Sequence, residues 1–186
     1  TDTTAFGRSY DQQQWAHAFG VTSLSVRLNP DISGIYSVYK WFTGEEPPAG
    51  DSMAVFMPPF QLLFSALQST GPDLTPENLA TAIRSFQTDK AISQPWLSWG
   101  DHGIWDEPDF NGIDDATLFW WDAEAEGPDE IRKVGKGMAV YVDGGKRYLP
   151  GEWGDEDRLF VADGGVSIYD SPPPGEEPPS YPSPAG

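Results

Sequence analysis

The segment LLFSALQSTGPDLTPENLATAIRSF, residues 62–86, constrains the fold more than any other part of the chain. Leucine and phenylalanine recur at helical spacing in its first half, and a glycine ends that run. In its second half Thr75 is suited to cap a helix, and Pro76 suits the first helical position. The segment therefore predicts two helices joined by a short turn. Because Pro58 and Pro59 precede it, we expect the first helix to begin at Pro58 or to kink there.

The rest of the chain predicts short helices and strands separated by turns. With 18 prolines and 20 glycines in 186 residues, a helical bundle is disfavoured. We expect an α/β fold that becomes β-rich toward the C-terminus. The predicted elements are a loop at 1–10, a helical turn at 11–19, a strand at 21–28, a helix at 33–44, a strand at 116–122, and a β-hairpin at 137–151 that turns at 143–145.

Composition divides the chain into three regions. Residues 1–90 carry the pattern of α/β lobes, and residues 91–168 form a strand and hairpin segment of the same fold. Residues 169–186 are a proline-rich tail that we expect to be disordered or polyproline II. The chain starts TDTTAFGRSYD, without methionine and without the basic and apolar run of a signal peptide. We therefore expect it to be the downstream part of a longer protein.

The charge of the chain excludes several classes of partner. There are 29 acidic residues against 11 basic ones, a formal net charge of −18, so the surface repels phosphate backbones. No cysteine is present, which excludes disulfides and thiolate metal sites. With only two histidines, a zinc site would need carboxylates to complete it. We expect no nucleic-acid partner, no bound metal and no cofactor.

The stretch DEPDFNGIDDATLFWWD, residues 106–122, gathers acids in front of aromatics. A calcium-binding EF-hand loop requires glycine at its sixth position, and no starting aspartate in this stretch provides that spacing. An irregular calcium site remains open. Its ligands would come from Asp109, Asn111, Asp114 and Asp115.

Catalysis and sugar binding find little support in the same stretch. Paired carboxylates for glycoside hydrolysis can be nominated anywhere in so acidic a chain. Trp120 and Trp121 are adjacent on a predicted strand and point to opposite faces, which favours core packing over a sugar-binding platform. No nucleophile-elbow motif occurs, and neither His17 nor His102 lies in a triad setting. We predict no catalytic residue, and we interpret 119–121 as a packed strand preceded by an acidic loop.

Three parts of the chain resemble the C-terminal part of the type I periplasmic binding proteins, the leucine/isoleucine/valine-receptor type that feed ABC transporters. LLFSALQSTGPDLTPENLATAIRSF is similar to that family's apolar helix, Gly-Pro turn and Thr-Pro-capped helix. TDTTAFGRSYDQQQWAHAFG upstream is similar to actinobacterial-style members. GDHGIWDEPDFNGIDDATLFWWDAEAEGPDE and GMAVYVDGGKRY resemble their closing segment.

The resemblance implies a receptor rather than an enzyme, with a partial type I periplasmic-binding-protein fold made of Rossmann-like lobe pieces. Such a receptor is extracytoplasmic and anchored at the cell surface. It binds an amino acid or related solute between two lobes and delivers it to an ABC transporter permease. A complete receptor is much longer, so this chain would be a fragment that binds its ligand weakly alone.

Ligand contacts are expected at the carboxyl ends of strands. The loop TDTTAFGR would follow such a strand, so Asp2, Thr3 and Thr4 are the predicted ligand-binding residues. Asp2 would pair with an ammonium group, and the threonine hydroxyls would hydrogen-bond the ligand. Phe56 and Met57 are predicted to line the cleft. The alternatives are a strand-end cap for the first three residues and core packing for the last two.

Two other classes of function stay open. A carbohydrate-binding or carbohydrate-processing domain would use tryptophans and carboxylates, and it predicts a strand-rich fold with a row of exposed tryptophans. A calcium-stabilised envelope domain predicts that a chelator lowers the melting temperature. The receptor hypothesis predicts three clear helices instead.

Overall fold

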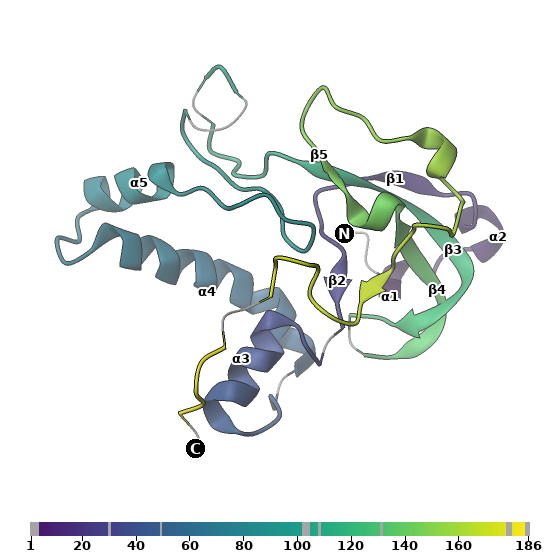
Figure 1. The fold of residues 1–186 in the computed structure, drawn as a ribbon, viewed down its shortest axis with the longest axis horizontal. Helices are drawn as coiled ribbons and strands as arrows, with labels where there is room; N and C mark the ends of the chain where they lie inside the picture. Colours follow the sequence, from purple (N-terminus) through teal and green to yellow (C-terminus); the bar gives the residue numbers. More distant parts are fainter. Residues whose placement is uncertain are drawn as a thin grey trace.

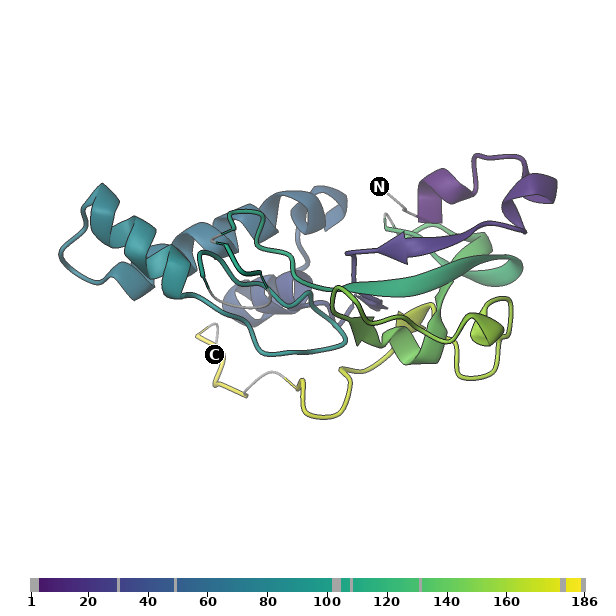
Figure 2. The same ribbon diagram turned by 90° about the horizontal axis from the view of Figure 1, so that it is seen from above.

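The computed structural model describes residues 4–29, 31–48, 50–101, 105–107, 109–130, 132–177 and 180–184. The helices are α1 (Thr4–Gly7), α2 (Gln12–Trp15), α3 (Gly34–Thr43), α4 (Gly50–Thr70) and α5 (Pro76–Ser85), with the 3-10 helices η1 (Val142–Gly145) and η2 (Glu156–Arg158). The strands are β1 (Phe19–Thr22), β2 (Arg27–Leu28), β3 (Ala116–Pro128), β4 (Val134–Tyr141), β5 (Arg147–Tyr148) and β6 (Ile168–Tyr169). The three longer helices gather at one end of the molecule and the main sheet at the other (Figures 1 and 2).

Strand β3 is the centre of the main sheet, and its neighbours run antiparallel to it. β1 pairs along one edge, with Phe19 opposite Trp120, and β4 pairs along the other, with Tyr141 opposite Phe119. Parallel pairing among the described strands is confined to the short pair β2 and β6. The expected mixture of helix and sheet is therefore confirmed, with a main sheet that is antiparallel.

Both faces of β3 are covered by core residues. Trp121 packs with Val26 on one face, and Leu118 and Trp120 pack with Val140 on the other. Because successive side chains of a strand alternate between faces, the two adjacent tryptophans belong to two different clusters. Trp120 is 7% exposed and Trp121 is 3% exposed, so the interpretation of 119–121 as a packed strand is confirmed.

The predicted β-hairpin at 137–151 is wrong, although the turn predicted within it is present as η1. β4 ends with Tyr141 opposite Phe119, and β5 resumes with Arg147 opposite Thr117, both on the edge of β3 away from β1. β4 and β5 are thus one interrupted strand along β3. Turn residues show where the chain leaves a strand, but they do not show that both β4 and β5 pair with β3 rather than with each other.

Gly145→Ala is expected to lower the free energy of unfolding by about 2–4 kcal/mol. Gly145 has φ +81, and a Cβ there would lie 2.1 Å from Cγ2 of Val26. The matched control is Gly151→Ala, at φ +85 with nothing within 4 Å of the new Cβ. The control therefore carries only the backbone strain, about 1–2 kcal/mol. Urea unfolding measures both variants, and equal losses would show that the fit of η1 against Val26 is unimportant.

The helix ends that depend on nearby capping residues were predicted correctly. Thr75 caps α5 by accepting a hydrogen bond from the Asn78 backbone N–H at 3.1 Å, and Gly44 ends α3 with φ 73. α4 begins at Gly50, so of the two alternatives at Pro58 the start is wrong and the kink stays a prediction. All three helices expected by the receptor hypothesis are present.

Two predictions near the N-terminus need correction. The predicted loop at 1–10 contains α1, because the Glu130 carboxylate accepts hydrogen bonds from the backbone N–H groups of Thr4 at 2.7 Å and Ala5 at 3.0 Å. A carboxylate at a helix N-terminus is stabilising, and this one is distant in sequence. The predicted strand at 21–28 is split into β1, which begins at Phe19, and the short β2.

The described part of the tail, which its composition predicts to be disordered, contacts the rest of the chain. Asn29 Nδ2 donates to Asp170 at 3.1 Å, and Trp41 Nε1 donates to the backbone carbonyl of Tyr181 at 2.9 Å. The tail runs from β6 toward α3, as the yellow trace in Figure 2 shows. Across the described residues, no helix has both the length and the apolar character needed to cross a bilayer.

Candidate ligand-binding site

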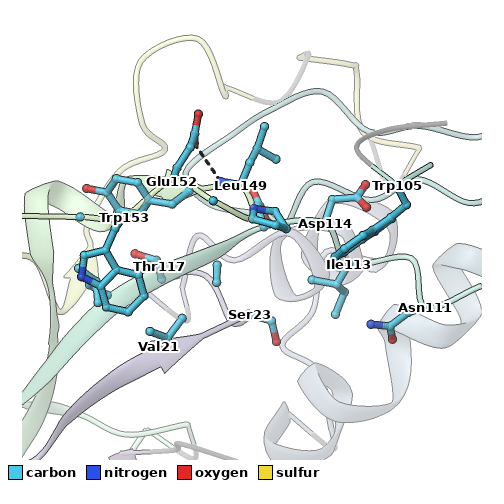
Figure 3. Close-up of a pocket in the computed structure, with 17 residues that line it drawn as sticks. Val21, Ser23, Trp105, Asn111, Ile113, Asp114, Thr117, Leu149, Glu152 and Trp153 are labelled. Atoms are coloured by element: carbon cyan, nitrogen blue, oxygen red, sulfur yellow. Dashed lines mark hydrogen bonds between the residues drawn. The ribbon is translucent and has the colours of Figure 1, made fainter. Parts of the chain in front are cut away.

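A cleft of about 550 Å³ opens beside the start of β3 (Figure 3). That volume lies within the range of roughly 300–1,000 Å³ that is typical of small-molecule sites. Three parts of the chain line it, in addition to Val21 of β1 and Ser23 just after that strand. They are the loop before β3 with Trp105, Asn111 and residues 113–115, the first residues of β3 at 116–118, and the segment 148–154 that begins in β5.

The loop before β3 folds back on itself and brings two acids to the cleft. The backbone N–H of Ser98 donates to the carbonyl of Gly112 at 3.0 Å. Gly112 has φ +81, and a Cβ there would lie 2.5 Å from the Trp99 ring, so glycine is required for this close packing. Asp114 and Asp115 follow directly, and both line the cleft where β3 begins.

Asp115 is engaged by the scaffold. Its carboxylate lies 2.8 Å from Nη2 of Arg147, with the two side chains only 6% and 4% exposed. Asp115 also accepts a hydrogen bond from the Trp96 backbone N–H at 3.1 Å. Arg147 donates to the carbonyls of Ser23 at 2.9 Å and Leu24 at 3.2 Å. This ion pair joins β5, the loop before β3 and the chain after β1, so Asp115 is not the group that would bind a ligand.

Asp114 has unused hydrogen-bonding capacity. Its residue is 3% exposed, and Oδ2 accepts a hydrogen bond from the Ser98 hydroxyl. Oδ1 is buried and has no hydrogen-bond partner among the described residues, and the same holds for Oγ1 of Thr117, which also lines the cleft. A buried oxygen without a partner is costly, more so on a charged group. A ligand N–H placed in the cleft would remove that cost.

Exposed aromatic rings stand at the sides of the cleft. Trp105 is 46% exposed and Trp153 is 58% exposed. Figure 3 shows Trp105 near Asp114 and Trp153 on the side of Thr117 and Val21. Large exposed rings around a few polar groups are typical of small-molecule sites.

The electrostatic environment of the cleft is negative. The pKa of Tyr148, which lines it, is raised by burial first and then by the negative charges of Asp143, Asp155 and Glu152. Carboxylates that disfavour a phenolate equally disfavour any anion placed there. The cleft is therefore suited to a cationic or neutral ligand.

Of the residues predicted from the sequence as ligand contacts, only Thr4 has a described side chain, and Thr4 does not line the cleft. Asp2 and Thr3 lie outside the described residues, as do the side chains of Phe56 and Met57 on α4. Thr4 is 3% exposed in α1, and its hydroxyl accepts a hydrogen bond from Nη2 of Arg27 at 3.2 Å. Its polar groups are thus used within the chain.

The four candidate calcium ligands are only partly brought together. Asn111, Asp114 and Asp115 line the cleft, whereas Oδ1 of Asp109 accepts hydrogen bonds from the backbone of its own turn, including that of Asn111 at 2.9 Å. Within the described ranges, no three histidine, aspartate or glutamate side chains are grouped as metal ligands. Trp153 was missed by sequence reasoning. The available signal was the GEWG motif, in which two glycines lie close to Trp153. The structure shows why the second glycine is needed, because a Cβ on Gly154 would lie 2.3 Å from Leu118.

The chemistry of the cleft thus rests on its own residues: one buried carboxylate with a free oxygen, one buried hydroxyl, and exposed indole rings. Such a set can bind and orient a ligand that donates hydrogen bonds. Comparison of this chain with family models, with curated proteins and with solved structures finds no match.

Proposed function

We propose that this chain is part of an extracytoplasmic solute-binding receptor for an ABC importer, with a type I periplasmic-binding-protein fold. Its ligand is an amino acid or a related small solute that carries an ammonium group. The receptor is anchored at the cell surface and passes the solute to a transporter permease. The motif resemblance and the capped helix pair α4–α5 support the receptor class.

One observation supports the ligand class: the buried Oδ1 of Asp114, which has no partner and lies in a cleft with a negative environment. An ammonium group donates charge-assisted hydrogen bonds, which are stronger than neutral ones. It would satisfy Oδ1 and could also donate to Oγ1 of Thr117. The indole rings of Trp105 and Trp153 are available to cover the apolar part of the solute.

A carbohydrate is the second candidate ligand. The observation in its favour is the pair of exposed indoles at the cleft, Trp105 and Trp153, which could stack on sugar rings. The three helices α3, α4 and α5 support the receptor over a strand-rich sugar-binding domain. The antiparallel main sheet differs from the mostly parallel sheet of Rossmann-like lobes.

Asp114→Asn is expected to weaken binding of an amine-bearing solute about ten- to hundredfold. Loss of a hydrogen bond to a charged group is worth about 1.5–3 kcal/mol, which corresponds to that range of affinity. Binding is measured by NMR titration of the chain with amino acids, simple amines and monosaccharides. The matched control is Asp163→Asn at an exposed position outside the cleft, which should bind like the parent chain.

The outcomes separate the candidates. Sugar binding that survives Asp114→Asn but is lost in Trp105→Ala and Trp153→Ala would favour the carbohydrate. If no solute shifts the signals of cleft residues, the proposed site is wrong. The receptor class is tested independently by sequencing the gene upstream of Thr1, where an unrelated domain would contradict it.

A further inference from the structure

Glu176 of the proline-rich tail lines a second hollow, next to the Asp115–Arg147 pair. This hollow has a volume of about 530 Å³. It is lined by the segment 90–92, by residues around β5 including Lys146, and by Glu176 of the tail. Glu176 is the only tail residue among the described ones that lines it.

The carboxylate of Glu176 is bound by a short backbone segment. Oε1 accepts a hydrogen bond from the Ile92 N–H at 2.7 Å, and Oε2 accepts one from the Ser93 N–H at 3.0 Å. The Ser93 hydroxyl also donates to Oε2. Both oxygens are thus engaged by three donors, which is a specific mode of carboxylate recognition. Its neighbour Glu177 accepts only from the Gly175 N–H of its own turn, at 2.9 Å.

Two lysines lie at the same hollow. Lys90 Nζ is 4.5 Å from the centre of the Trp96 ring, and Lys146 Nζ is 5.2 Å from the centre of the Tyr148 ring. Both are exposed, and neither forms an ion pair with a carboxylate in the described part of the chain. In a chain of net charge −18 two such lysines at one hollow are a local exception.

Most of the acids at this hollow are already engaged. Asp115 pairs with Arg147 at 2.8 Å, and Asp143 pairs with Arg158 at 3.3 Å. Glu152 accepts a hydrogen bond from the Leu149 N–H at 2.9 Å. Asp143 and Glu152 keep the negative charge that also acts on Tyr148, so the backbone donors of Ile92 and Ser93, with the two lysines nearby, must outweigh it for a carboxylate to bind here.

We propose that Ile92 and Ser93, with Lys90 and Lys146, form a carboxylate-binding site that Glu176 of the tail occupies in cis. An external small carboxylate competes with the tail for this site. The tail has the advantage of a tether, which gives it a high effective concentration. The two hollows share Asp115, Leu149 and Glu152, but Lys90, Ile92 and Lys146 line only this one. The ligand here is an anion, and the inference does not rest on the function proposed for the cleft beside Asp114.

The test is an NMR titration of the full chain with succinate, using sodium chloride at equal ionic strength as the control salt. In the parent chain the amide signals of Ile92 and Ser93 should be shifted downfield by the Glu176 carboxylate. Glu176→Ala should move both signals upfield, and succinate should then move them back. If the tail fills the site about nine-tenths of the time, succinate should bind about tenfold more tightly to the variant than to the parent chain.

Glu177→Ala is the matched control and should behave like the parent chain. Glu176→Gln keeps the shape of the side chain and replaces the alanine variant if that variant is poorly folded. Without the carboxylate charge, the Ile92 and Ser93 amide signals should still lose their downfield shift. The proposal is overturned if either Glu176 variant keeps the parent amide shifts. It is also overturned if succinate binds variant and parent equally, or if chloride produces the same changes.

Discussion

Replacing Arg8 by alanine should lower the free energy of unfolding by about 3–5 kcal/mol, one of the two largest effects expected for a single substitution in this chain. The Arg8 side chain is 15% exposed and reaches into the end of the β3–β4 hairpin. Its guanidinium group donates hydrogen bonds to four backbone carbonyls. They are those of Gly127 at 2.7 Å, Lys133 at 2.9 Å, Gly135 at 2.6 Å and Gly137 at 3.0 Å.

The same guanidinium lies 3.4 Å from the carboxylate of Asp129, whose side chain is 4% exposed. Alanine at position 8 would remove this buried ion pair and the hydrogen bonds to the four carbonyls, while Asp129 would still accept from the Lys133 backbone N–H at 2.9 Å. Such removal is far more costly than the net gain of a single hydrogen bond. Arg8→Lys should recover little stability, because a lysine ammonium cannot reproduce the planar set of five donors.

Urea unfolding of three variants tests this role of Arg8. The control is Lys136→Ala, which removes a basic residue from the same hairpin. Lys136 pairs with Glu124 at 2.7 Å, but the two side chains are 65% and 83% exposed, so no measurable loss is expected. Equal losses in Arg8→Ala and Lys136→Ala, or full recovery in Arg8→Lys, would refute the structural role of Arg8.

The arginines explain how so acidic a chain can fold. Arg8, Arg27 and Arg147 all use their guanidinium groups on backbone carbonyls and carboxylates within the fold. Arg27, for example, donates to the carbonyl of Pro128 at 3.1 Å and lies 3.7 Å from Glu130. These cations are consumed inside the molecule. These three of the 11 basic residues are therefore not available at the surface to offset the net charge of −18.

Elements set by local signals could be predicted from the sequence. α5 depends on its Thr75 cap and Pro76, and α3 ends at Gly44, because helix ends are determined by groups within a few residues. β3 was predictable from its alternation. Its two tryptophans then had to lie on opposite faces, whatever strands surround them.

Elements set by distant partners could not be predicted. The four carbonyls that Arg8 binds lie 119 to 129 residues away in the sequence, and no local pattern indicates such a pairing. The interruption between β4 and β5 was taken for a hairpin because the turn residues at 143–145 do not indicate that both strands pair with β3. In the candidate site Asp114 was considered only as a calcium ligand, because its free oxygen depends on which groups the fold places around it.

Asp115→Asn should also lower the free energy of unfolding by about 3–5 kcal/mol. The substitution preserves shape and an acceptor oxygen but removes the charge that faces Arg147 at 2.8 Å. Arg147 would remain as a buried cation, with a side chain that is 4% exposed and an Nε that already has no hydrogen-bond partner. Because the pair is buried, salt should screen it little, so the loss should persist in high salt.

Asp114, the adjacent residue, supplies the matched control. Comparing the stabilities of Asp114→Asn and Asp115→Asn tests how the two acids differ. Asp114→Asn removes a buried negative charge whose Oδ1 has no partner, so it should leave the free energy of unfolding unchanged or raise it. The same variant is expected to lose affinity for an amine-bearing solute. Denaturant unfolding in low and high salt measures stability, and NMR titration measures binding. If Asp114→Asn proves as destabilising as Asp115→Asn, Asp114 belongs to the scaffold and the proposed ligand contact is wrong. If it gains or keeps stability while losing affinity, the carboxylate is maintained for a ligand at the expense of the fold.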